Sequence, residues 1–164
     1  MSKVDLSAAA FWDYSVSVYT RSDVAAHALS LQDNHGVNVN LLLLLCWCLE
    51  NGVVLNLKQF SDLRAAIADS ESALQQHRVQ RRQAHPDNGG NQADYEVLKA
   101  QELVLEREQQ AQLVSALEQL DKVVIPSASS GGIMNASVAA FIHSYQIRDS
   151  EAARRHLSVI VSLL

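Results

Sequence analysis

Three histidines in this 164-residue sequence lie close to an aspartate, an arrangement that general acid and base catalysis can use. The pairs are Asp33 with His35, His85 with Asp87, and Asp149 with His156. Asp33 and Asp149 flank expected helix ends, where capping is the commoner role of an aspartate. The sequence has no glycine-rich phosphate loop, nucleophile elbow or zinc-helix motif. We therefore expect no catalytic residue and no enzymatic activity.

The two cysteines, Cys46 and Cys48, are the first candidates for metal binding. A zinc site needs a second pair of Cys or His at ligand spacing, and the six histidines supply no such pair. Both cysteines lie in one apolar segment. We expect them to be buried and reduced, and we expect no metal and no cofactor.

A second set of polar residues is Asp13, Gln32, Asp33, Asn38 and Asn40. If the ends of neighbouring helices meet, these side chains form a polar cluster that binds a ligand or a partner. Each also has a purely structural explanation, since Asn38 or Asn40 suits the N-cap of the apolar helix that follows. The sequence leaves open whether they converge.

Three arginines, Arg78, Arg81 and Arg82, precede the motif His85-Pro86-Asp87 and the turn residues 88–91. This pattern resembles a J domain, the co-chaperone module that stimulates the ATPase of heat-shock chaperones. The resemblance implies that the basic helix, His85 and Asp87 contact a partner. The tyrosine and Leu-Gly turn that precede this motif in J domains are missing from residues 55–74, and Pro, Asp, Asn and Gly are also typical of a tight turn. We interpret the motif as a hairpin turn and keep the partner contact as an alternative.

Glycines and prolines divide the chain, and between them apolar residues recur every three or four positions, which predicts helices. The expected helices are residues 7–19, a second helix that ends at Gly36, and then 41–49, 58–84, 92–121, 135–147 and 150–164. Ser22 or Asp23 is the expected cap of the second helix, and Asn135 and Asp149 are the expected caps of the last two. Residues 58–121 form a long helical hairpin, and 127–132 a flexible loop. Residues 53–57 are expected to be a connector, because no second strand is recognised. The 41–49 helix is apolar on all sides and should lie at the centre of a bundle.

Several short segments match another family in order. They are Phe11-Trp12-Asp13-Tyr14, Leu31-Gln32-Asp33 with Gly36, Val39-Asn40-Leu41-Leu42-Leu43, Trp47, and residues 102–108. Over about residues 8–120 the chain resembles the bacterial domain of unknown function 2390 family. The resemblance implies a helical bacterial protein, and the family carries no established activity.

Composition bounds the remaining possibilities. With 48% hydrophobic and 19% charged residues and a net charge of −5, the chain should fold as one all-α domain, a bundle of about seven helices. The longest apolar run, 41–49, falls short of the roughly 20 residues of a membrane span, and Asp5 and Asp13 bracket the apolar stretch near the start, so we expect a cytoplasmic protein without a membrane partner. The arginines lack a wider basic face, so nucleic-acid binding is not expected.

By elimination, we expect a non-enzymatic protein-interaction or adaptor module whose hairpin arms contact an unidentified protein. The alternatives are the J-domain-like co-chaperone and a small-molecule-binding protein or unrecognised enzyme. The last of these needs a deep pocket near Asp13 and Asn40. The oligomeric state is left open.

Overall fold

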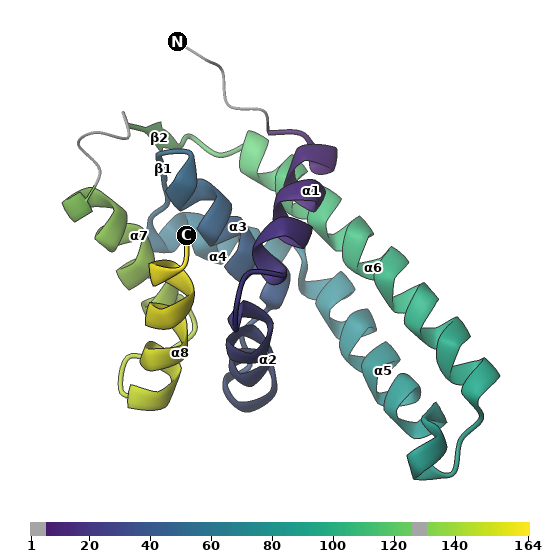
Figure 1. Cartoon of the computed structure of the whole chain (residues 1–164). Helices are drawn as coiled ribbons and strands as arrows, with labels where there is room; N and C mark the ends of the chain where they lie inside the picture. The colour runs from purple at the N-terminus through teal and green to yellow at the C-terminus, as the bar shows by residue number, and fades with distance from the viewer. Residues whose placement is uncertain (1–5, 126–130) are drawn as a thin grey trace.

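The computed structural model describes residues 6–125 and 131–164, and within them the chain forms eight α-helices, one 3-10 turn and two short strands. The elements are α1 (Ala8–Tyr19), α2 (Val24–His35), α3 (Val39–Glu50), β1 (Val53–Val54), α4 (Leu57–Ala66), α5 (Ala68–Ala84), η1 (Pro86–Asn88), α6 (Gln92–Glu118), β2 (Val123–Val124), α7 (Gly131–Ser144) and α8 (Glu151–Ser162). The all-α prediction is confirmed, with eight helices instead of about seven (Figure 1).

The first helix boundaries follow from local chemistry. Gly36 ends α2 in the left-handed region, at φ 68°, where a side chain is disfavoured. Asn38 then caps α3, because its Oδ1 accepts the backbone N–H of Leu41 at 2.8 Å. Both positions agree with the sequence-based prediction, and of the two candidate asparagines it is Asn38 that forms the cap.

Helix α3 lies at the centre, as its apolar composition predicts. All nine side chains from 40 to 48 are buried, and Trp47 stacks on Phe11 of α1 with ring centroids 5.1 Å apart. Helices α1, α2, α6 and α7 pack around α3. A centrally placed helix needs an apolar surface on every side, because each face contacts a neighbour.

The predicted helix 58–84 is divided. Helix α4 ends before Ile67 and α5 begins after it, and Ile67 itself, at φ −110° and ψ 10°, departs from helical geometry. The Ile67 side chain is buried in the core. Helix α4 packs on α7 and α6 in the body, whereas α5 runs outward beside α6 (Figure 1). One straight helix would not satisfy both packing directions.

The expectation of a connector at residues 53–57 is wrong for its first two residues. Val53 and Val54 form β1, which pairs antiparallel with β2 in the register Val53 with Val124 and Val54 with Val123. The partner strand follows α6, some 70 residues downstream, and two valines are too few to be recognised as a strand in sequence.

The C-terminal boundaries also differ from expectation. Helix α7 begins at Gly131, so residues 131–132 of the predicted loop are helical, and its remaining residues, 127–130, lie outside the described part of the chain. The cap of α8 is Ser150, whose Oγ accepts the N–H of Ala153 at 3.1 Å, and not Asp149. Helix α8 packs against α2, which lies more than 100 residues earlier in the sequence.

The predicted hairpin is present in its outer part. Helices α5 and α6 run side by side away from the body and are joined through η1 (Figure 1). Among the described residues, no helix has both the length and the apolar character needed to cross a membrane.

Candidate functional site

Four amide side chains meet where the start of α3 faces the inner half of α6, and we call them the amide network. They are Asn38 and Asn40 of α3 and Gln109 and Gln110 of α6. All four are buried, with Gln109 0% and Gln110 2% exposed. Amides in a core are tolerated only when they bond to one another or to other polar groups, so the network fixes how α6 packs on α3.

The orientation of each amide follows from the cap of α3. Because Asn38 Oδ1 accepts the Leu41 N–H, Asn38 Nδ2 donates to Gln109 Oε1 at 3.0 Å. Asn40 Nδ2 donates to the same oxygen at 2.9 Å, and the Asn40 Oδ1 accepts from Gln110 Nε2 at 3.0 Å. Gln110 Nε2 also donates to Ser15 Oγ of α1 at 3.0 Å.

The chain of amides ends at Gln110. Its Oε1 is shielded from solvent and accepts no hydrogen bond from any described residue. At the other end, Gln109 Nε2 donates to Ser70 Oγ of α5 at 3.0 Å, and Asn38 Nδ2 also donates to the Glu71 carboxylate. The network therefore connects α1, α3, α5 and α6.

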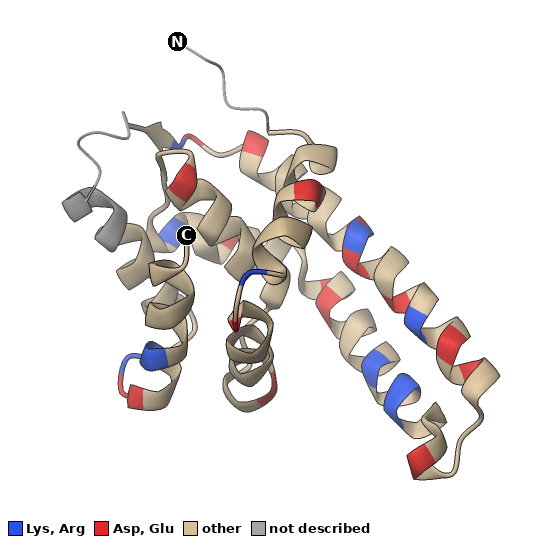
Figure 2. Cartoon of the chain, viewed as in Figure 1, with Lys and Arg blue, Asp and Glu red and all other residues tan. Residues whose placement is uncertain are grey.

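A group of four charged residues lies farther out between the hairpin arms. Arg78 Nε is 3.4 Å from Glu102 Oε1, Arg78 Nη2 is 3.6 Å from Glu106 Oε1, and Arg81 Nε is 2.6 Å from Glu102 Oε2. Figure 2 shows basic residues in the outer part of α5 beside a stretch of α6 that carries both acidic and basic residues. Burial, and then the neighbouring Glu102, raise the pKa of Glu106 above its usual value.

A groove of about 460 Å³, here called the α1–α6 groove, opens beside this charged group. Its walls come from α1, α2, α3, α5 and α6, and they include Trp12, Ser15, Val16, Tyr19, Leu29, Gln32, Val39, Asn40, Leu43, Arg78, Arg81, Lys99, Glu102, Leu103, Glu106 and Gln110. Three of the apolar side chains are unusually exposed: Val16 at 51%, Leu29 at 44% and Leu103 at 54%. The groove thus combines an apolar rim with amide and charged groups in its wall.

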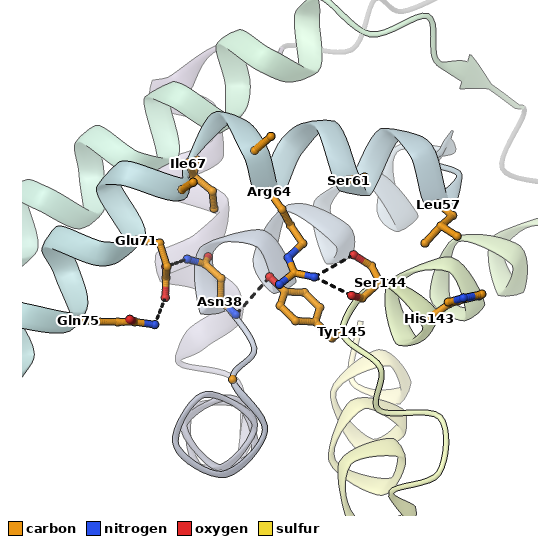
Figure 3. A pocket seen from close by; sticks show the side chains of 13 residues that line it. Asn38, Leu57, Ser61, Arg64, Ile67, Glu71, Gln75, His143, Ser144 and Tyr145 are labelled. Carbon is orange, nitrogen blue, oxygen red and sulfur yellow. Dashed lines mark hydrogen bonds between the residues drawn. The ribbon is translucent and has the colours of Figure 1, made fainter.

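A second hollow, of about 590 Å³, lies at the Asn38 end of the network (Figure 3). Several of its polar groups bind one another. Arg64 Nη1 donates to the Ser144 carbonyl at 2.6 Å, and the Arg64 guanidinium lies 4.2 Å over the Tyr145 ring. The Tyr145 hydroxyl accepts the Asn38 backbone N–H at 3.4 Å. Burial raises the pKa of Tyr145 to about 12, so the hydroxyl stays protonated. These mutual contacts favour a structural role for this hollow.

The predicted polar cluster converges only in part. Asn38 and Asn40 join the amide network, and Gln32 lines the α1–α6 groove beside Asn40. Asp13 and Asp33 are exposed and line neither hollow.

Sequence reasoning missed the residues of α6 that complete the site. Glu102, Glu106 and Gln110 lie one helical turn apart along one face, and Gln109 is fully buried. The signal was present, because polar residues at spacing four interrupt the apolar stripe of this helix. A solvated face is the usual explanation of such a pattern, so the pattern alone does not indicate a buried site.

The predicted partner-contact residues divide into two groups. Arg78 is 6% exposed, and both Arg78 and Arg81 are ion-paired within the hairpin, so they offer little charge to a partner. Arg82 and Asp87 are exposed at the hairpin tip, and His85 is partly buried. His85 Nδ1 accepts the Asp87 backbone N–H at 3.1 Å, which shapes the turn, and its ring packs edge-on against Tyr95.

The histidine–aspartate pairs gain little support as catalytic groups. His85 Nδ1 lies 3.6 Å from the Asp87 carboxylate, which is almost fully exposed. His156 instead contacts His27 of α2, with their Nδ1 atoms 2.8 Å apart. Within residues 6–125 and 131–164, no three His, Cys, Asp or Glu side chains come together as metal ligands. Cys46 and Cys48 are buried free thiols, and burial raises the pKa of each to about 12.

The model of the family described as "Protein of unknown function (DUF2390)" matches residues 10–113, from α1 to near the end of α6. The matched stretch contains every member of the amide network, the whole of α5, and α6 except for its last five residues. No curated protein and no solved structure matches the chain.

Proposed function

The chain belongs to the DUF2390 family of proteins of unknown function, and we propose that it is a non-enzymatic module that binds a partner protein in the bacterial cytoplasm. The partner docks in the α1–α6 groove. Helix α6, one arm of the hairpin, supplies one wall, and the exposed face of α1 supplies the other.

One observation carries this proposal: Val16, Leu29 and Leu103 come from three different helices and meet at one groove. Single exposed apolar side chains are ordinary, but a concave cluster of them is typical of an interaction site. The buried charges beneath the rim add polar groups that orient a partner. An apolar segment of a partner protein, flanked by polar residues, fits this surface.

The test is affinity capture from bacterial lysate, with a groove variant compared with a matched control. Leu103→Asp places a carboxylate on the rim, and Val97→Asp makes the same change on the same helix outside the groove, at nearly equal exposure of 54% and 56%. We expect a partner that wild type and Val97→Asp retain and Leu103→Asp loses by at least tenfold. Equal recovery by both variants, or no partner above background, would contradict the proposal.

A third bait addresses the co-chaperone alternative. The double variant His85→Gln, Asp87→Asn changes the hairpin tip and leaves the groove intact. Loss of a captured heat-shock chaperone ATPase with this bait alone would support the J-domain-like hypothesis over the groove.

The groove also supports a second candidate, small-molecule binding, because it is a pocket that contains Asn40. The pocket does not include Asp13, the other residue of that hypothesis. A thermal-shift screen of metabolites against wild type and Leu103→Asp tests it, since a specific ligand stabilises the wild type alone.

A further inference from the structure

The unsatisfied oxygen of Gln110 is the starting point. A buried amide oxygen without a donor is destabilising, and such atoms in a native fold call for an explanation. Gln110 is 2% exposed, lines the α1–α6 groove, and its Oε1 accepts no hydrogen bond from the described residues.

Exchanging the nitrogen and oxygen of Gln110 does not solve the problem. The exchange would place the Gln110 oxygen against Asn40 Oδ1, which is also an acceptor. Asn40 cannot turn in response, because its Nδ2 donates to Gln109 Oε1 at 2.9 Å and to the backbone carbonyl of Glu106 at 3.4 Å. Gln109 is held in turn by Asn38, whose own oxygen caps α3. The Asn38 cap of α3 therefore fixes the orientation of every amide in the network and leaves Gln110 Oε1 without a donor.

The charges of the groove narrow the chemistry of a group that satisfies this oxygen. Arg78 and Arg81 pair with Glu102 and Glu106, so the paired charges nearly balance and the remaining cation of the lining, Lys99, disfavours a cationic donor. An anion is disfavoured too, because Gln110 Oε1 and the Glu106 carboxylate are acceptors. The group that best satisfies Gln110 Oε1 is therefore an uncharged hydrogen-bond donor carried by an apolar side chain.

The walls favour an aromatic body. Trp12 and Tyr19 of α1 line the groove together with the apolar rim. Tryptophan and tyrosine side chains combine a large apolar surface with one neutral donor, and they are enriched at the centres of protein interfaces.

On the basis of the proposed function, we propose that the partner inserts a tryptophan side chain into the α1–α6 groove and that its indole N–H donates to Gln110 Oε1. Because this oxygen is shielded from solvent, the entering ring displaces side chains beside it. Changes of rotamer of this kind are common when interfaces form.

Two isomeric probes test the inference in the wild-type protein. 3-Methylindole is the tryptophan side chain itself, and 1-methylindole has the same size and composition but no N–H. Titrations are followed by the NMR signals of the labelled methyl groups of Val16, Leu29 and Leu103. We expect 3-methylindole to shift these signals and 1-methylindole to bind at least about fivefold more weakly. Equal affinities, or no shift with either probe, would overturn the inference.

Variants of two glutamines on α6 refine the test. Gln110→Leu removes the acceptor, and we expect the ratio of the two affinities to fall to about one. Gln112→Leu makes the same change at an exposed position on the same helix and should leave the ratio unchanged. If Gln110→Leu does not fold, the two probes in the wild-type protein still decide the matter.

The capture experiment separates this inference from the proposed function. A partner that Leu103→Asp loses, combined with equal probe affinities, would retain the docking groove and reject the tryptophan anchor. Equal capture by Leu103→Asp and Val97→Asp, combined with a strong preference for 3-methylindole over 1-methylindole, would retain the aromatic site and reject protein docking.

Discussion

Replacing Gln109 with leucine tests whether the amide network holds α6 against α3. The Gln109 side chain makes three hydrogen bonds of 3.0 Å or less, to Asn38, Asn40 and Ser70, and it is fully buried. Leucine has a similar volume, so the change removes polar partners without a large cavity.

The magnitude follows from the partners left behind. Three neutral hydrogen bonds contribute about 1 kcal/mol each, and the Asn40 Nδ2, left with one long contact to a carbonyl, adds a desolvation cost of about 2 kcal/mol. Burial of the leucine side chain returns about 2 kcal/mol. The free energy of unfolding should therefore fall by about 3 kcal/mol, which lowers Tm by roughly 6–12 °C for a chain of this size.

Urea unfolding followed by far-UV circular dichroism measures this change, with Gln112→Leu as the exposed control on the same helix. A double variant, Asn40→Leu with Gln109→Leu, should lose less stability than the sum of the two single variants, because each single variant already removes the bond between Asn40 and Gln109. Equal stability of Gln109→Leu and Gln112→Leu would show that the amide network does not hold α6 against α3.

Three further predictions concern charge, pH and backbone conformation. Glu102→Gln breaks the ion pairs to the buried Arg78 and the partly buried Arg81 and should lower the free energy of unfolding by about 3 kcal/mol. The exposed Glu108→Gln should change it by less than about 0.5 kcal/mol in the same urea titration. The pKa of His156 is lowered, by burial and then by the neighbouring histidine of α2, so the fold favours the neutral ring. The stabilisation that the neutral His156 provides is complete above the ordinary pKa near 6.5 and is lost as the pH falls through the lowered pKa. A His156→Gln variant should therefore show a smaller drop in Tm than wild type between pH 7.5 and 5. Gly52→Ala should destabilise more than Gly36→Ala, because both glycines have positive φ but a Cβ at 52 would overlap the Ile125 carbonyl, while a Cβ at 36 meets no atom of the described residues within 4 Å; equal Tm values would contradict this.

The sequence was sufficient to predict features that depend only on interactions between neighbouring residues. Gly36 ends α2 and Asn38 caps α3 because backbone sterics and one short side chain act over three or four residues. The central place of α3 was also predictable, since a helix apolar on every face has no solvated position in a bundle.

The sequence was insufficient where two distant segments meet. Val53 and Val54 form a strand only because residues 123 and 124 arrive beside them. The helix breaks at Ile67 because α4 packs on α7 as well as on α6, whereas α5 follows α6 outward. In both cases the packing partner lies too far away in the sequence to be recognised from the neighbouring residues.

The candidate site shows the same division. Asn38 and Asn40 were singled out from sequence, but Gln109 and Gln110 were not, because polar residues in a long helix are usually exposed to solvent. Their burial depends on amides and hydroxyls supplied by three other helices.

By itself, then, the sequence determined the helical class, the end of α2 at Gly36, an asparagine cap for α3 and the central helix, because propensity, capping and apolar periodicity act between near neighbours. Only the tertiary structure decided which polar residues are buried, which arginines are neutralised, and that Val16, Leu29 and Leu103 share one groove. The physical reason is that hydrogen bonds, ion pairs and grooves between helices depend on the relative placement of segments far apart in the chain.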